Sequence, residues 1–247
     1  MSKVRHFKSL LDINKKEFLR IIDRSIQLKR ESLEGIANTS FSNKTLAMIF
    51  KKNSTRTRVA FETAMATMGG HAIFLPSDTT QISRGEELSD TAKVLSGMVD
   101  IIMVRTHDHK EIEELAENSS VPVINGLTEK FHPCQLLADM QTYFEEKGSI
   151  EGKKVAWVGD GCNMCNSYIN AAKVLNFNLK IATPSGFEPD QATLDLAKDN
   201  VELCDMPGKA VEDCDLVTTD VWSSMGDEGE SEKRKLMFKG YQINKHL

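Results

Sequence analysis

The sequence predicts an α/β protein of two doubly wound domains with parallel sheets, the second incomplete at its C-terminus. Short apolar runs of strand length alternate with segments whose apolar residues recur every three or four positions, as in amphipathic helices. This alternation is typical of parallel sheets with helices on both faces. A polar segment at 148–153 (GSIEGK) separates two such series and divides the chain into domains 1–148 and 149–247.

The first series predicts four strands and five helices. The strands are expected at 45–50, 71–75, 100–105 and 121–125, and the helices at 14–31, from the turn after residue 50 to 68, 88–98, 109–118 and 135–147. Residues 76–87 contain turn formers without apolar periodicity, which predicts a long loop. The helix at 135–147 is expected to link the two domains.

The second series is shorter. It predicts strands at 154–158, 179–183, 201–203 and 216–219, with one helix from the turn at 159–163 to about 175 and another near 190–199. The segment 227–247 is highly charged and has few apolar residues. About four strands are fewer than a doubly wound half usually carries, so we expect this domain to lack its last strand and helix.

Composition narrows the class of protein. The 247 residues are 40% hydrophobic and 27% charged, which is typical of a globular protein with a real core. The net charge is −5 and charges of both signs are mixed along the chain, which argues against a nucleic-acid partner. No apolar run reaches the length of a membrane span. The N-terminus has no signal-peptide pattern, and five cysteines are an odd number. We therefore expect a cytoplasmic protein with free thiols.

The turn after the strand at 45–50 predicts an anion site. Three hydroxyl residues, Ser54, Thr55 and Thr57, open the next helix and alternate with Arg56 and Arg58. The first N–H groups of a helix lack partners, and the helix dipole is positive there. An arginine adds a planar fork that grips phosphate or carboxylate oxygens. A phosphate or carboxylate ligand is therefore favoured over an ordinary capped helix.

Two further strand ends carry candidate residues of the first domain. Arg105 ends the third strand, and His132 precedes a helix that contains Cys134 and Gln135. Because ligands bind at the carboxyl ends of parallel strands, these side chains are expected to converge on the anion turn. A lone histidine is more often structural, but here His132 is interpreted as an electrophilic donor. Cys134 is interpreted as a packing residue rather than a nucleophile.

The first strand of the second domain ends in a glycine turn. Gly159 and Gly161 begin a dinucleotide-like fingerprint, but its third glycine is absent. A tight turn, with a ligand approaching Asn163, is the favoured interpretation. Cys162 and Cys165 have the spacing of a redox pair at a helix start, although two small residues near a turn is the simpler interpretation.

The last strand ends at Asp220, which is followed by a short loop that contains Ser224, Met225 and Gly226. A carboxylate and a short flexible loop at a strand end are suited to binding a polar ligand. A simple surface turn is an equally good interpretation of these residues alone.

Taken together and in this order, the motifs resemble those of the aspartate/ornithine carbamoyltransferase family. They are Ser54-Thr-Arg-Thr-Arg58, Arg105-Thr-His, His132-Pro-Cys-Gln135, Gly159-Asp-Gly161 with Asn163, and Asp220-Val-Trp-Ser-Ser-Met-Gly226. The resemblance runs from about residue 7 to 241, and the last motif resembles the ornithine-specific members. It implies carbamoyl transfer from carbamoyl phosphate to the δ-amine of L-ornithine, without a metal or organic cofactor.

The resemblance also implies roles for the candidate residues. Carbamoyl phosphate would be bound by Ser54, Thr55, Arg56, Thr57, Arg105, His132 and Gln135, with Thr57, Arg105 and His132 polarising its carbonyl group. Ornithine would be bound by Asn163, Asp220, Ser224 and Met225. Gln81, on the loop at 76–87, would reach the active site of a neighbouring subunit in a homotrimer and bind carbamoyl phosphate there.

One departure from the family pattern concerns the end of the sequence. The family continues beyond Leu247 with a His-Cys-Leu-Pro segment and a last helix, so we expect a complete phosphate half and an incomplete ornithine half of the site. Three other functions stay open at this point. They are a non-catalytic carbamoyl phosphate-binding protein, a carbamoyltransferase for another amine, and a dithiol oxidoreductase.

Overall fold

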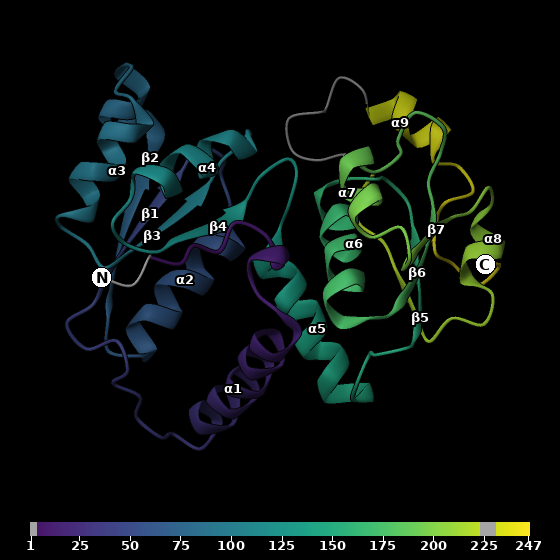
Figure 1. The fold of residues 1–247 in the computed structure, drawn as a ribbon, viewed down its shortest axis with the longest axis horizontal. Coiled ribbons are helices and arrows are strands. Elements are labelled where there is room, and N and C mark those ends of the chain that lie inside the picture. The colour runs from purple at the N-terminus through teal and green to yellow at the C-terminus, as the bar shows by residue number, and fades with distance from the viewer. Residues whose placement is uncertain (1–3, 223–230) are drawn as a thin grey trace. The chain divides into compact units, whose positions relative to one another are not determined.

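The computed structural model describes residues 4–222 and 231–247, which divide into two compact units at residues 141 and 142. Each unit is an α/β fold on a four-stranded, wholly parallel sheet (Figure 1). The predicted fold class is therefore confirmed. The division falls inside the helix α5 (Pro133–Lys147), whereas the sequence places the boundary just after that helix.

The first unit contains the sheet β2-β1-β3-β4. Its strands are β1 (Thr45–Phe50), β2 (His71–Pro76), β3 (Ile101–Arg105) and β4 (Val123–Leu127). Its helices are α1 (Lys15–Leu33), α2 (Thr55–Thr67), α3 (Leu88–Ser96), α4 (His109–Asn118) and the start of α5, with short 3-10 turns η1 (Leu10–Asp12), η2 (Ser77–Thr79) and η3 (Gln81–Arg84).

Alternate residues of β1 face the two sides of this sheet, because successive side chains of a strand point to opposite faces. Ala47 and Ile49 pack with residues of α3 and α4, whereas Leu46, Met48 and Phe50 pack with residues of α2. Both faces of the strand are therefore buried. This explains why its sequence is a continuous apolar run rather than an alternating one.

The second unit contains the sheet β7-β6-β5-β8. Its strands are β5 (Lys154–Val158), β6 (Asn178–Ala182), β7 (Val201–Leu203) and β8 (Leu216–Thr218), and its helices are α6 (Asn163–Leu175), α7 (Gln191–Leu196), α8 (Pro207–Val211) and α9 (Ser231–Met237). Ala156 packs with Ala210 of α8, whereas the ring of Trp157 lies 5.6 Å from that of Tyr168 on α6. Helices therefore cover both faces of this sheet as well.

Several sequence expectations need correction, among them the ends of α1 and α3, which lie at Leu33 and Ser96 rather than at residues 31 and 98. The strand β4 begins and ends two residues later than expected, and α7 ends at Leu196 rather than at residue 199. The expected loop at 76–87 contains the two short turns η2 and η3. The helices α8 and α9 were not expected, because five and seven residues are too few to display helical periodicity.

Candidate active site

The first sheet reverses its strand order at β1. The chain runs from β1 to β2 on one side and then to β3 and β4 on the other, so the reversal lies between β1 and β3. Phe50 at the end of β1 is paired in register with Arg105 at the end of β3. In doubly wound sheets the crevice at such a reversal is where ligands bind. Two of the predicted site segments therefore begin at this point.

The anion turn leads from β1 into α2. Ser54 is the N-cap of the helix, and its Oγ accepts a hydrogen bond from the Thr57 N–H at 3.3 Å. Thr55 and Arg56 are exposed in the first turn, where further backbone N–H groups point out of the helix. The predicted cap is thus present. The hydroxyl residues and Arg56 therefore lie at the start of α2, which is the positive end of the helix dipole.

Arg105 brings the end of β3 to this helix start. Its Nη1 donates a hydrogen bond to the Thr57 Oγ1 at 3.2 Å, although the side chain is only 7% exposed. Burial lowers the pKa of the guanidinium, and its Nε has no hydrogen-bond partner within the described residues. A buried cation with an unused donor beside a helix N-terminus is suited to bind an anion.

His132 lies immediately before α5, and it interacts electrostatically with Arg105. Burial, and then the positive charge of Arg105, lower the pKa of His132 from 6.5 to about 4. The imidazole is therefore neutral near pH 7, and a neutral imidazole donates one hydrogen bond and accepts another. It can polarise a carbonyl group without adding a second full charge beside Arg105.

The loop before His132 is fixed by buried polar residues. The Phe131 N–H donates to the Thr128 Oγ1 at 3.1 Å, and the Asn125 Nδ2 donates to the Lys8 carbonyl at 2.8 Å. The Cys134 Sγ donates to the Asn125 carbonyl at 3.4 Å, and burial raises the pKa of this thiol to about 12. A protonated thiol with an internal acceptor supports the packing interpretation of Cys134.

Two supporting residues were missed by sequence reasoning. The half-buried Lys51 donates from Nζ to Glu111 at 2.8 Å, and its backbone N–H donates to the Arg105 carbonyl at 2.8 Å. The Thr106 hydroxyl donates to the same Glu111 carboxylate. This network ties the segments after β1 and β3 together. Glu111 sits in a charged helical run, where its sequence gives no sign of a buried partner.

The second sheet reverses its order between β5 and β8, and the remaining candidate residues lie there. A Cβ atom placed on Gly159 would lie 2.9 Å from the Thr219 Oγ1, so the segments after the two strands are in close contact. The Cys162 Sγ donates to the Asp220 Oδ2 at 3.9 Å, and Asn163 is the first residue of α6. Asn163 and Asp220 therefore both follow strands that meet at this reversal.

Gly161 has a steric role in this turn. Its N–H donates to the Phe187 carbonyl at 2.8 Å, and an added Cβ would lie 2.4 Å from backbone atoms of Glu188 and Pro189. A real Cβ cannot approach backbone so closely. The glycine is thus explained by close packing of two loops.

Comparison with known proteins identifies the family. Residues 5–145 match the model of the aspartate/ornithine carbamoyltransferase carbamoyl-P binding domain, and residues 151–247 match that of the Asp/Orn binding domain. The chain belongs to the aspartate/ornithine carbamoyltransferase family. The resemblance inferred from the motifs is confirmed, and each matched family domain corresponds closely to one compact unit.

Individual carbamoyltransferases are similar over nearly the whole chain. The ornithine carbamoyltransferase of Methylococcus capsulatus is 53% identical over 99% of this chain and 81% of its own length. The ornithine carbamoyltransferase of Hydrogenovibrio crunogenus is 52% identical over 98% of this chain and 80% of its own length. The solved structure of ornithine carbamoyltransferase from Pyrococcus furiosus has 46% identity and a TM-score of 0.93, over 98% of this chain and 80% of that one.

Several residues that the family resemblance assigns to the site make other contacts here. The exposed Gln135 donates to Asp139 of its own helix at 2.9 Å, and Gln81 is exposed at the start of η3. Arg58 pairs with Glu62, and its guanidinium lies 3.6 Å from the centre of the Phe74 ring, so these contacts connect α2 with β2. Ser224 and Met225, assigned to ornithine, lie outside the described residues.

The cysteine pair at the start of α6 does not have the properties of a dithiol redox centre. Burial raises the pKa of Cys162 to about 12 and that of Cys165 well above its usual range. Reactive thiols need a lowered pKa, because the thiolate is the nucleophile. The oxidoreductase alternative is therefore disfavoured.

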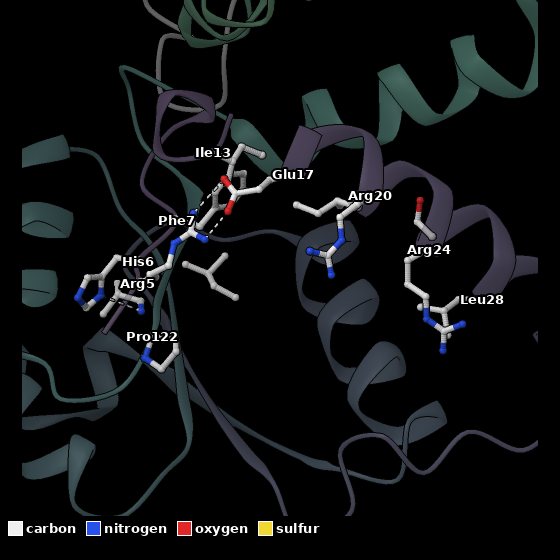
Figure 2. A pocket seen from close by; sticks show the side chains of 13 residues that line it. Arg5, His6, Phe7, Ile13, Glu17, Arg20, Arg24, Leu28 and Pro122 are labelled. Carbon is white, nitrogen blue, oxygen red and sulfur yellow. Dashed lines mark hydrogen bonds and ion pairs between the residues drawn. The ribbon is translucent and has the colours of Figure 1, made fainter. Parts of the chain in front are cut away.

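A groove of about 620 Å³ lies away from the candidate active site, between α1 and the residues that lead into β4 (Figure 2). Phe7, Ile21 and Val123 contribute apolar surface, and Arg20 and Arg24 project from α1. Val123 is the first residue of β4, so the groove lies at the amino end of that strand. The catalytic candidates lie at the opposite, carboxyl ends.

Among residues 4–222 and 231–247, no helix is both long and apolar enough to cross a membrane. Within the same residues, no group of three or more His, Cys, Asp or Glu side chains is arranged to hold a metal ion.

Proposed function

We propose that this chain transfers the carbamoyl group of carbamoyl phosphate to the δ-amine of L-ornithine, giving L-citrulline and phosphate. The observation that carries the proposal is Arg105, a buried cation that contacts Thr57 at the N-terminus of α2 in the carbamoyl-P binding domain. Relatives named ornithine carbamoyltransferase, at 52% and 53% identity, support ornithine as the acceptor.

The phosphate group of the donor would occupy the start of α2. Ser54, Thr55, Arg56 and Thr57 would supply hydroxyl groups, backbone N–H groups and a guanidinium, which suit the oxygens of a phosphate. Arg105 would reach both a phosphate oxygen and the carbonyl oxygen. Because its Nε has no protein partner among the described residues, it has a donor to offer.

The chemistry follows from where charge develops. The neutral δ-amine attacks the carbamoyl carbon, a C–N bond forms, and the C–O bond to phosphate breaks with its electron pair leaving on phosphate. Negative charge grows on the carbonyl oxygen, where Thr57, Arg105 and the neutral His132 would donate hydrogen bonds. Each well-placed donor of this kind typically contributes ~2.7–4 kcal/mol to the transition state. The attacking nitrogen loses a proton as the product forms.

The other substrate groups would be bound as follows. Gln135 would turn from Asp139 to the carbamoyl nitrogen when the donor binds. Asn163 and Asp220, at the reversal of the second sheet, would bind the amino-acid end of ornithine together with Ser224 and Met225. Holding both substrates converts a bimolecular reaction into an effectively unimolecular one.

We further propose a homotrimer in which Gln81 of one subunit completes the site of its neighbour. Its exposed position at the start of η3, within the segment between the edge strand β2 and α3, supports a role in contacts outside its own unit. A cytoplasmic location is part of this proposal, supported by the five free cysteines, which suit a reducing compartment.

The direct test measures citrulline formed from carbamoyl phosphate and ornithine, with isothermal titration of carbamoyl phosphate alongside. Arg56→Ala is expected to abolish carbamoyl phosphate binding. Arg30→Gln, which removes the same charge from exposed α1, should change neither measurement. Binding without turnover in the unmodified chain would instead favour the non-catalytic alternative. Preferred turnover of another amine, tested with putrescine, would overturn ornithine as the acceptor.

Shared active sites make a separate prediction. Subunits carrying Arg105→Gln and subunits carrying Gln81→Ala should each be nearly inactive alone. Mixing and reassembling them should restore part of the activity, because some sites would receive both native residues. No recovery in mixed trimers, or a monomer in sedimentation, would contradict the shared site.

A further inference from the structure

Arg234 on the short helix α9 connects the two segments that border the amino-acid half of the site. Its guanidinium pairs with the Asp160 carboxylate, between Gly159 and Gly161, and also donates to the Trp222 carbonyl. Asp160 follows β5, and Trp222 lies two residues after Asp220, beyond β8. One side chain from a third element therefore holds the segments that follow both strands of the sheet reversal.

The contact is largely shielded from solvent. The Arg234 and Asp160 side chains are 14% and 18% exposed, and the guanidinium lies 4.7 Å from the centre of the Phe187 ring. The fully buried Phe238 just beyond α9 stacks with the Trp222 ring at 5.9 Å. Phe238 thus anchors the helix on the unit, and Arg234 is held in one place.

On their other side, the same two segments contact each other and carry substrate candidates. Gly159 packs against Thr219, and Cys162 lies against Asp220. Neither of these contacts is a strong bond, since one is steric and the other is a 3.9 Å thiol contact. The guanidinium contacts are charge-assisted, and such hydrogen bonds are roughly twice as strong as neutral ones.

We propose that Arg234 is a positioning residue for ornithine, which fixes the segment of Asp220 against the turn before Asn163. The proposal rests on the proposed function, because it assigns Arg234 to the ornithine half of that site. Arg234 does not touch the substrate. Its effect passes through the Asp160 carboxylate and the Trp222 carbonyl, which set the separation of the two binding residues.

Substituting Arg234 should weaken ornithine binding more than it slows the chemistry. Asp220 and Asn163 would bind the amino-acid end of ornithine, which is remote from the reacting bond, and loss of such binding raises KM with kcat nearly unchanged. For Arg234→Gln we expect the KM for ornithine to rise about tenfold, as for the loss of a charge-assisted bond. The KM for carbamoyl phosphate should stay within about twofold, because that site lies in the other unit.

The experiment compares four variants of the full chain. Arg234→Gln removes the positive charge, and Arg234→Lys keeps the charge without the planar guanidinium. Asp160→Asn removes the negative charge with which Arg234 pairs. Lys235→Gln is the control, because Lys235 is 61% exposed and its ion pair among the described residues is with Glu232 of the same helix. Steady-state kinetics for both substrates are measured together with hydrogen exchange of backbone amides at 154–165 and 216–222.

The proposal predicts faster exchange in both segments and a raised KM for ornithine in Arg234→Gln and Asp160→Asn, with partial rescue in Arg234→Lys. Lys235→Gln should match the unmodified chain. An unchanged KM for ornithine in a folded Arg234→Gln chain would overturn it. A rise in both KM values together with an equal fall in kcat would also overturn it. If the unmodified chain shows no turnover, the proposed function fails, and exchange at the two segments still decides whether Arg234 holds them.

Discussion

Replacing Arg105 by glutamine tests whether this cation serves catalysis or only the stability of the fold. Arg105 is 7% exposed, and the only hydrogen bond that its side chain makes to the described residues is the 3.2 Å contact with Thr57. No carboxylate of the described chain neutralises it, and burial lowers its pKa. Glutamine keeps a polar, hydrogen-bonding side chain of smaller size while removing the charge.

The magnitudes follow from these contacts. Loss of one donor to a developing oxyanion costs about 10²–10³ in kcat, and Arg105 would serve both the phosphate and the carbonyl oxygen. We therefore expect kcat/KM to fall at least about 10³-fold. Loss of the Thr57 hydrogen bond costs about 1 kcal/mol of stability, but glutamine no longer buries a charge without a counter-ion. The melting temperature without ligand should therefore stay the same or rise by a few degrees.

The assay combines citrulline formation with thermal unfolding in the presence and absence of carbamoyl phosphate. A ligand at 100 times its Kd stabilises the native protein by ≈ 2.7 kcal/mol, so the unmodified chain should melt several degrees higher with the ligand. Arg105→Gln should lose most of this increase. The ligand-induced increase then reports the anion site independently of turnover.

Lys51→Met provides the contrasting case. It leaves the half-buried Glu111 without its cation, which costs about 1–3 kcal/mol, so this variant should lose melting temperature. If Arg105→Gln instead loses melting temperature as Lys51→Met does, Arg105 is a structural residue. If Arg105→Gln retains kcat/KM, the placement of the donor beside Thr57 is wrong.

Three further predictions concern other residues. Because the pKa of His132 is lowered from 6.5 to about 4, the unfolded chain binds a proton that the folded chain does not, and stability should decline as pH falls from about 6.5 to about 4. Urea unfolding should show a loss of up to about 3 kcal/mol from this residue, and a His132→Gln variant with the same pH dependence would contradict it. Gly161→Ala should lower the melting temperature and raise the KM for ornithine, because the added Cβ would lie 2.4 Å from backbone atoms. Gly208→Ala is the control and should change neither quantity, because nothing lies within 4 Å of its added Cβ. Equal melting temperatures of the two variants would argue against the close packing at Gly161. Combined Cys162→Ser and Cys165→Ala changes should leave carbamoyl transfer largely intact, and loss of all activity in a folded variant would revive a redox role.

The local features of this protein could be predicted from its sequence. Short runs of apolar residues are a local feature of the sequence, and the strands β1, β5 and β7 were predicted with the bounds that the structure has. The cap of α2 is also local, because Ser54 and Thr57 are three residues apart. The same reasoning missed α8 and α9, which are held by tertiary packing and are too short to show a period.

Only the tertiary structure decided which of these side chains meet. Arg105 and Thr57 are separated by 48 positions, Lys51 and Glu111 by 60, and Arg234 and Asp160 by 74. Such contacts depend on the order of strands in each sheet, which no short-range pattern encodes. Strand order brings Arg105 beside the helix cap as a buried cation. It also gives a charged residue of the C-terminal segment a partner at the turn before Asn163.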